Sequence, residues 1–246
     1  MKKTLVVLVA LAFPALLFAQ DIFDLAESGT PAQVQAALSA GARADARDPR
    51  GQTVLMHAAL FTMSPRVITM LVKAGARVAD QDAHGWTALL LAARSNTRPE
   101  VLAALIESGA DINARDKEGE TPLMAASASN TNPAVLSLLL QNGARVNDRN
   151  SAGATPLMLA AALNPEPRMI TLLLKAGARI GEQDPDGKTA LMFAARFNPN
   201  PRVLGALLAA GSDRRLTSKE GKTAADYALV NPGLKGTPEL LQLRVR

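Results

Sequence analysis

A spacing of 34 residues recurs along most of the chain, and it constrains the fold more than any other feature of the sequence. Three sets of residues keep this spacing without a slip: Gly51, Gly85, Gly119, Gly153, Gly187 and Gly221; Gly41, Gly75, Gly109, Gly143, Gly177 and Gly211; and Pro31, Pro65, Pro99, Pro133, Pro167 and Pro201. A fixed period of this size indicates stacked copies of one supersecondary unit. Such an array presents a long surface to a partner and seldom hides one catalytic cleft.

Residues 116–149 show how one copy begins. The residues before Gly119 predict a turn, because glycine readily adopts a positive φ. Thr121 and Pro122 then predict the start of a first helix, since threonine caps a helix and proline at its first position loses no hydrogen bond. We expect this helix to end near Asn130, in the left-handed conformation that asparagine tolerates.

The second half of the copy predicts another helix. Asn132 is a good N-cap residue and Pro133 can open the helix. The apolar stripe of this helix is formed by Val135, Leu136, Leu139 and Leu140. Helices of about ten residues are too short to be stable alone in water. Neighbouring copies must therefore bury each other's apolar stripes, and we expect the stripe of the last copy to include Leu241.

This unit resembles the ankyrin repeat, whose signature is Thr-Pro-Leu-His-x-Ala. Two copies that follow it are Thr121-Pro122-Leu123-Met124-Ala125-Ala126 and Thr155-Pro156-Leu157-Met158-Leu159-Ala160. Methionine or leucine replaces the histidine of the signature, and the period is one residue longer than the usual 33. The resemblance implies an all-α solenoid of stacked helix-turn-helix units with projecting β-turn loops.

The same resemblance divides the chain. Residues 20–246 are expected to form a single ankyrin-repeat domain. Within it we expect an N-terminal capping repeat at 20–47, five full repeats at 48–217 and a C-terminal capping repeat at 218–246.

Residues 1–19 do not fit the repeat and have the pattern of a secretory signal peptide. A basic start is followed by an apolar run and a small residue, which predicts cleavage after Ala19. The alternative is a membrane anchor, but the apolar run is interrupted by Pro14 and is shorter than the roughly 20 residues of a membrane span. The pattern is of the bacterial type and predicts a periplasmic or secreted protein, with no transmembrane segment once the signal is removed.

The charge of the mature chain is mild. Loss of Lys2 and Lys3 leaves 25 basic and 22 acidic residues, a formal charge of +3, and this balance does not predict a nucleic-acid partner. One ordered basic feature is an arginine ladder, formed by Arg43, Arg77, Arg145 and Arg179, each of which follows Gly-Ala. The ladder is either a solvated edge or a surface that binds an anionic ligand or the cell envelope.

Residues that could carry catalysis are few. The chain contains two histidines, His57 and His84, and no cysteine. No phosphate-binding loop, zinc-ligand spacing or nucleophile elbow occurs in the sequence. The carboxylates of Asp82, Asp116 and Asp184 recur at one turn position, which predicts that they bond turn amides. We therefore predict no enzyme activity, no catalytic residue, no metal site and no cofactor.

The family resemblance implies that a partner protein binds a concave face lined by the turns and by the ends of the first helices. Residues at these positions differ from copy to copy, while their neighbours do not. The candidates are Arg50, Leu60, Phe61, His84, Trp86, Arg94, Glu120, Leu163, Lys188, Arg196 and Phe197.

Trp86 is the only tryptophan, and the other copies place Gln, Glu, Ala or Lys at its position. Because tryptophan and arginine are enriched in binding hot spots, we predict that Trp86, Leu60, Phe61, His84 and Arg94 form one binding patch. The competing interpretation is that Trp86 folds down on a neighbouring turn. The sequence thus predicts a monomeric, exported, non-catalytic scaffold for a partner protein whose identity it does not give.

Overall fold

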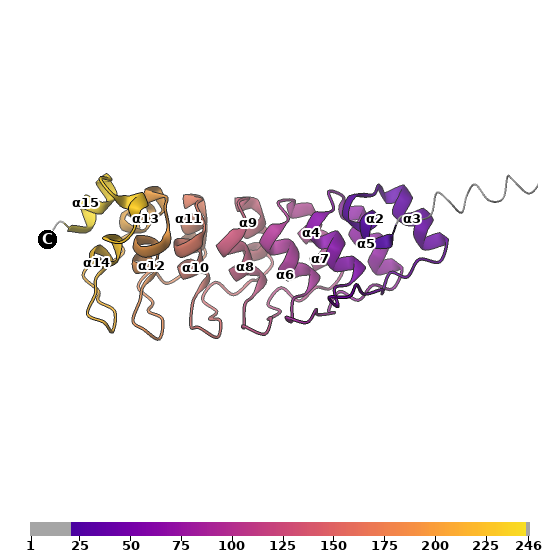
Figure 1. Cartoon of the computed structure of the whole chain (residues 1–246), viewed down its shortest axis with the longest axis horizontal. Coiled ribbons are helices and arrows are strands. Elements are labelled where there is room, and N and C mark those ends of the chain that lie inside the picture. The colour runs from indigo at the N-terminus through magenta and orange to yellow at the C-terminus, as the bar shows by residue number, and fades with distance from the viewer. Residues whose placement is uncertain (1–20, 245–246) are drawn as a thin grey trace, which may run out of the picture.

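The computed structural model describes residues 21–244, and these form a row of helix pairs stacked side by side (Figure 1). The first helices of the pairs are α2 (Ile22–Ser28), α4 (Val54–Phe61), α6 (Ala88–Ser95), α8 (Pro122–Ser129), α10 (Pro156–Leu163), α12 (Ala190–Phe197) and α14 (Ala224–Ala228). The second helices are α3 (Pro31–Ser39), α5 (Pro65–Lys73), α7 (Pro99–Glu107), α9 (Pro133–Gln141), α11 (Pro167–Lys175), α13 (Pro201–Ala209) and α15 (Pro238–Arg244). The predicted all-α solenoid is confirmed.

The predicted signal peptide at residues 1–19 lies outside the described residues. Within residues 21–244, the helices are all too short or too polar to span a bilayer.

The start of each helix follows from local chemistry. In α8, the side-chain oxygen of Thr121 accepts a hydrogen bond from the backbone N–H of Met124, at 3.3 Å. In α9, the side chain of Asn132 caps the helix that Pro133 opens. Gly143 follows α9 with a φ of 88°, a conformation that a residue with a side chain rarely adopts. The capping predictions are confirmed for both helices.

The core is a continuous layer between the pairs. Each first helix contacts the first helices before and after it, and Leu123 of α8 is fully buried at this contact. In α9, Leu136 and Leu139 are also fully buried, which confirms the predicted stripe. Because these short helices gain their stability from neighbours, the array is held together along its whole length.

The last pair departs from the prediction. Leu241 is 63% exposed, whereas Leu243 is 5% exposed and belongs to the core. The physical reason is an insertion that includes a short 3-10 helix, η1 (Pro232–Leu234), before α15. The longer connection presents a different side of α15 to the rest of the array.

A buried row of asparagines joins the pairs, and the left-handed conformation predicted for one of them, Asn130, was wrong. Asn130 ends α8 in an extended conformation, with φ −76° and ψ 131°, and not in the left-handed one. Its Nδ2 donates hydrogen bonds to the backbone oxygens of Ala93 and Asn96, at 2.9 and 3.0 Å. Its Oδ1 accepts from the N–H of Asn132 at 2.9 Å. This conformation points the side chain at the preceding pair, where the last carbonyls of a helix have no partner within that helix.

The same arrangement recurs along the array. We call this set the asparagine ladder: Asn96, Asn130, Asn164, Asn198 and Asn231. Each member is buried and donates to two backbone oxygens of the pair before it.

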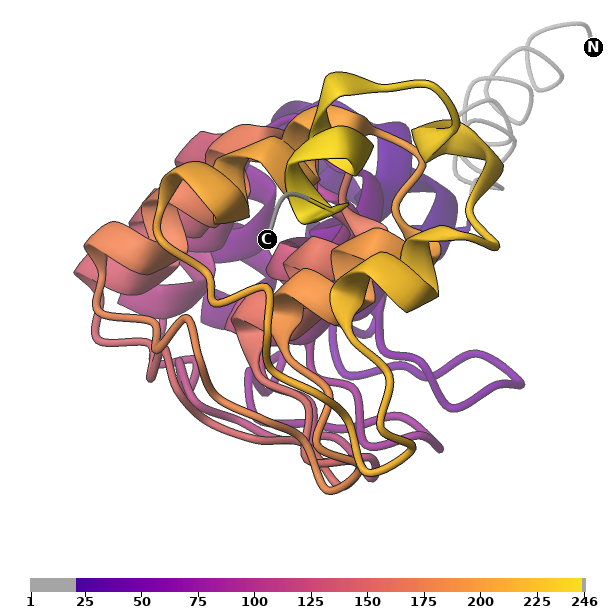
Figure 2. The same ribbon diagram turned by 90° about the vertical axis from the view of Figure 1, so that its left-hand side faces the viewer.

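The turns between pairs project to the same side of the helices (Figure 2). As predicted, the turn carboxylates bond backbone amides: Oδ1 of Asp116 accepts from the N–H groups of Glu118 and Glu120, at 3.0 and 2.8 Å. The turns are also tied to each other, because Nη1 of Arg115 donates to the backbone oxygens of Gly119 and Arg149. A row of braced turns therefore stands beside the row of first helices.

Candidate functional site

A cavity of about 670 Å³ lies in the angle between the turns and the first helices. We call it the Trp86 cavity. Its lining residues are Gln52, Leu60, Asp82, His84, Trp86, Leu91, Arg94, Ser95, Asp116, Glu118 and Glu120. Five of the predicted binding residues are therefore brought together in one place: Leu60, His84, Trp86, Arg94 and Glu120.

Trp86 serves both the scaffold and the cavity. The residue is half-buried and packs against the hydrophobic core, and the guanidinium carbon of Arg94 lies 5.0 Å from the centroid of its ring. Trp86 therefore also supports the scaffold, in line with the competing interpretation, because the residue packs against the core. The rest of the residue lines the cavity.

One side of the cavity is acidic. Asp116 is 8% exposed, and burial raises the pKa of its carboxyl group, with a further rise from the charge of Glu118. Burial also raises the pKa of Glu120, as does the negative charge of Asp116. Arg94 opposes this rise at Glu120, but the four carboxylates of the lining outnumber its single guanidinium. The cavity is consequently negative at neutral pH.

A second cluster of predicted residues lies near the C-terminal end of the array. The guanidinium carbon of Arg196 is 5.1 Å from the ring centroid of Phe197 and 5.6 Å from that of Tyr227. The rings of Phe193 and Phe197 are stacked with centroids 6.2 Å apart. Lys188 forms an ion pair with Asp186 at 2.8 Å. The guanidinium of Arg196 thus lies among aromatic rings, while the charge of Lys188 is paired with that of Asp186.

Three of the predicted residues belong neither to the lining of the Trp86 cavity nor to the C-terminal cluster. Phe61 is 54% exposed and Leu163 is 59% exposed, on the last turns of α4 and α10. The side chain of Arg50 is exposed on a turn. The structure thus does not bring Phe61 into the cavity with Trp86.

The residues predicted from the sequence did not include Gln52, Asp82, Leu91, Ser95, Asp116 and Glu118 of the cavity, or Phe193 and Tyr227 of the C-terminal cluster. A signal for three of them was present in the sequence. Leu91, Phe193 and Tyr227 occupy one position of the first helix, which varies among the copies and holds His57 in α4. Asp116 was predicted to be structural because a carboxylate recurs at its turn position. It differs from the other copies in its surroundings, which include Glu118 and Glu120.

Three members of the arginine ladder form ion pairs. Arg43 pairs with Asp45 at 3.0 Å, Arg77 with Asp80 at 3.2 Å, and Arg179 with Glu182 at 2.9 Å. Asp80 and Glu182 are each shared with a second arginine, Arg47 and Arg149, so the carboxylates reduce the positive charge of the ladder without removing it. Exposed pairs of this kind contribute little to stability.

The histidine of the first full repeat is structural. Nδ1 of His57 lies 2.7 Å from Oε1 of Glu27, and its Nε2 lies 3.2 Å from Oδ2 of Asp48. Its ring also meets the ring of Phe23 edge-on, with centroids 4.9 Å apart. These contacts join α4 to α2 and to the first turn. In the described part of the chain, no group of histidines and carboxylates is arranged to hold a metal ion.

Comparison with known proteins supports the architecture. A family model described as "Ankyrin repeats (3 copies)" matches residues 22–116, 98–184 and 158–243. The crystal structure of the ankyrin repeat domain of Bcl-3, titled a unique member of the IkappaB protein family, is 27% identical. The similarity to it covers 91% of this chain and 97% of that one, with a TM-score of 0.69. A comparison with curated protein sequences gives no match.

Proposed function

The chain belongs to the ankyrin repeat family, a non-catalytic binding fold, and we propose that it is an exported scaffold that holds a partner protein on its concave face. By concave face we mean the surface between the turns and the first helices. Compartment and partner are both part of the proposal: the protein acts in the periplasm or outside the cell.

The Trp86 cavity is the observation that carries the proposal. It is concave, and it combines an apolar wall with a few charged groups, as binding sites generally do. It also contains the single tryptophan of the chain, the residue type most enriched in binding hot spots. Since the braced turns hold its rim, the cavity is formed before a partner arrives, which lowers the entropic cost of binding.

Replacing Trp86 with glutamine is expected to weaken partner binding by about 2 kcal/mol, roughly thirtyfold. Gln52 occupies the same position one copy earlier, so the turn accepts this side chain. The free energy of unfolding is also expected to fall by about 1–2 kcal/mol, because the contact between the partly buried Trp86 side chain and the core is lost. The measurement is capture from a cell-envelope extract, followed by titration of the purified partner.

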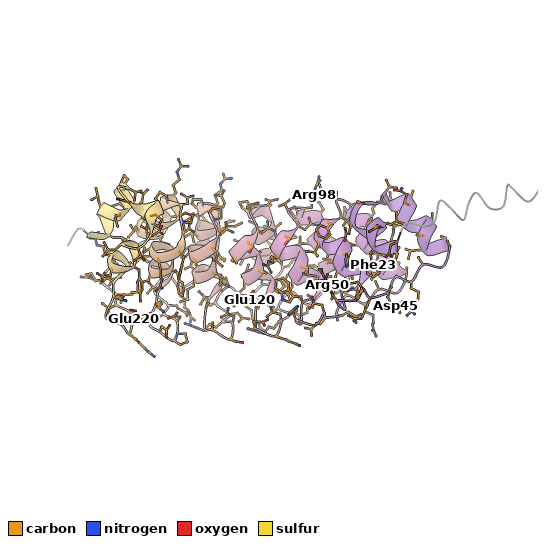
Figure 3. The ribbon with its side chains drawn as sticks, viewed as in Figure 1. Phe23, Asp45, Arg50, Arg98, Glu120 and Glu220 are labelled. Carbon is orange, nitrogen blue, oxygen red and sulfur yellow. The ribbon has the colours of Figure 1, made fainter. Side chains whose placement is uncertain are left out.

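Arg98→Ala is the matched control for this variant. Arg98 lies at the start of α7, and Figure 3 shows it on the edge of the molecule opposite Glu120. Binding that survives Trp86→Gln unchanged but is lost in Arg98→Ala would place the partner on the other side of the array.

Export is proposed from the pattern of residues 1–19, which combines a basic start, an apolar run and a small residue at the cleavage site. Protein recovered from cells is expected to begin at Gln20, as measured by mass spectrometry of the intact chain. A protein produced without residues 1–19 should unfold as cooperatively as the processed one, because the core of the described residues extends from α2 to the end of the array. Recovery of the chain with Met1 retained would contradict the proposal.

A further inference from the structure

We propose that the Trp86 cavity receives a lysine or arginine side chain of the partner protein, held between an apolar wall and an acidic one. This inference rests on the proposed function, since it describes how the concave face recognises its partner.

The apolar wall suits the stem of such a side chain. It is formed by Leu60, Trp86 and Leu91, of which Leu91 is 7% exposed and the other two are half-buried. Lysine and arginine bury their methylene stems on apolar surface while their charged heads reach polar groups. The cavity volume of about 670 Å³ leaves ample room for one such side chain.

The acidic wall suits the charged head. It is formed by Asp116, Glu118 and Glu120, which belong to a single turn. Arg94 supplies the one guanidinium group among the residues that line the cavity. This group lies over the ring of Trp86 and forms no ion pair within the described residues. The other titratable groups of the lining are Asp82 and the imidazole of His84. The carboxylates of the lining therefore outnumber its basic groups, which leaves net negative charge at the site.

Asp116 distinguishes this turn from the two before it. Oδ2 of Asp48 is in contact with His57 at 3.2 Å, and Oδ2 of Asp82 accepts from Gln52 at 3.4 Å. In Asp116, only Oδ1 is bonded, to the turn amides. Its Oδ2 has no hydrogen-bond partner among the described residues, although the residue is more than nine-tenths buried and lines the cavity.

The Oδ2 atom is not among the fully buried atoms of the chain, so it stays open to the cavity, and a cation that reaches it forms a charge-assisted hydrogen bond. Burial raises the pKa of both Asp116 and Glu120, which is the effect of removing their charges from water. A bound cation favours the ionised forms and lowers both pKa values again. Binding should therefore be complete above the raised pKa values and be lost as the pH falls through them.

The emission of Trp86 tests the proposal, because no other tryptophan contributes to the signal. The probes are three blocked pentapeptides, acetyl-Gly-Gly-X-Gly-Gly-amide, in which X is arginine, glutamine or glutamate. Each is titrated into the folded chain at low salt, and calcium chloride is titrated separately. The arginine peptide is expected to shift the emission and to bind at least tenfold more tightly than the other two.

The chain offers variants that keep the turn intact. Asn150 holds the position of Asp116 in the next copy, and Gln52 holds the position of Glu120 two copies earlier. Oδ1 of Asn150 accepts from two turn amides, as Oδ1 of Asp116 does. The double variant Asp116→Asn with Glu120→Gln should therefore fold and lose the preference for the arginine peptide at least tenfold. Asp184→Asn, at the equivalent turn outside the cavity, should leave the preference unchanged.

Every other outcome contradicts the proposal. Tighter binding of the glutamate peptide, equal binding of all three peptides, no response to any of them, or a response to calcium at lower concentration than to the arginine peptide would each overturn it. If capture of the partner depends on Trp86 but not on Asp116 and Glu120, the scaffold function stands. Only the proposal that the Trp86 cavity receives a cationic side chain is then contradicted.

Discussion

Replacing Asn130 with alanine is expected to lower the free energy of unfolding by about 3 kcal/mol or more. The side chain is buried and makes three hydrogen bonds, to the backbone oxygens of Ala93 and Asn96 and from the N–H of Asn132. Its removal leaves these backbone groups without a partner in a region closed to water, and each such group costs about 1–3 kcal/mol. Two of the lost hydrogen bonds connect α8 to the preceding helix pair. Their removal weakens the packing between pairs, on which the stability of such short helices depends.

Denaturation by urea, followed by circular dichroism, measures this effect. Asn142→Ala is the matched control, because Asn142 is exposed and its Nδ2 bonds only a carbonyl of its own helix, that of Leu138. The control should lose about 1 kcal/mol or less. Similar losses in both variants would contradict a special role for the asparagine ladder.

Leu139→Ala is expected to cost about 2–5 kcal/mol, the usual penalty for a cavity in place of a buried leucine. Leu139 is fully buried in the stripe of α9, in the middle of the array. In a stack of nearest neighbours, a central defect separates two halves that can then unfold independently. We therefore expect a broader transition, or two transitions, in addition to the loss of stability.

Leu25→Ala provides the terminal comparison. Leu25 is 6% exposed in α2, at the start of the array. Truncation of this side chain should let the N-terminal helix pair unfold first. The remaining pairs should still unfold in a single main transition. The two variants are compared by calorimetry and by hydrogen exchange of individual helices. Equal broadening in both, or in neither, would argue against a linear stack of coupled pairs.

The repeating part of the fold was predictable because it is local. Threonine caps, proline at the first helical position and glycine after the helix act within a few residues, and the structure of α8 and α9 follows them. Asn130 was predicted as a helix end but in the wrong conformation. Its conformation is decided by carbonyls of the preceding pair, 34 and 37 residues away, which a local signal does not contain.

The candidate site was predictable only in part, for the same reason. Variation among copies identified Leu60, His84, Trp86, Arg94 and Glu120, which share one cavity. It did not reveal that part of the Trp86 ring covers the core, since this depends on packing between pairs. It also did not reveal that three of the four arginines of the ladder form ion pairs with carboxylates.

Photo-cross-linking in intact cells tests the central claim most directly, namely that the concave face holds a partner protein. A photoreactive amino acid replaces either His84, which lines the Trp86 cavity, or Arg98, which lies on the opposite edge of the molecule. We predict a covalent adduct of defined mass from position 84 and none from position 98, with the adduct lost when Trp86→Gln is added. An adduct from position 98 alone, or equal adducts from both positions, would contradict the account.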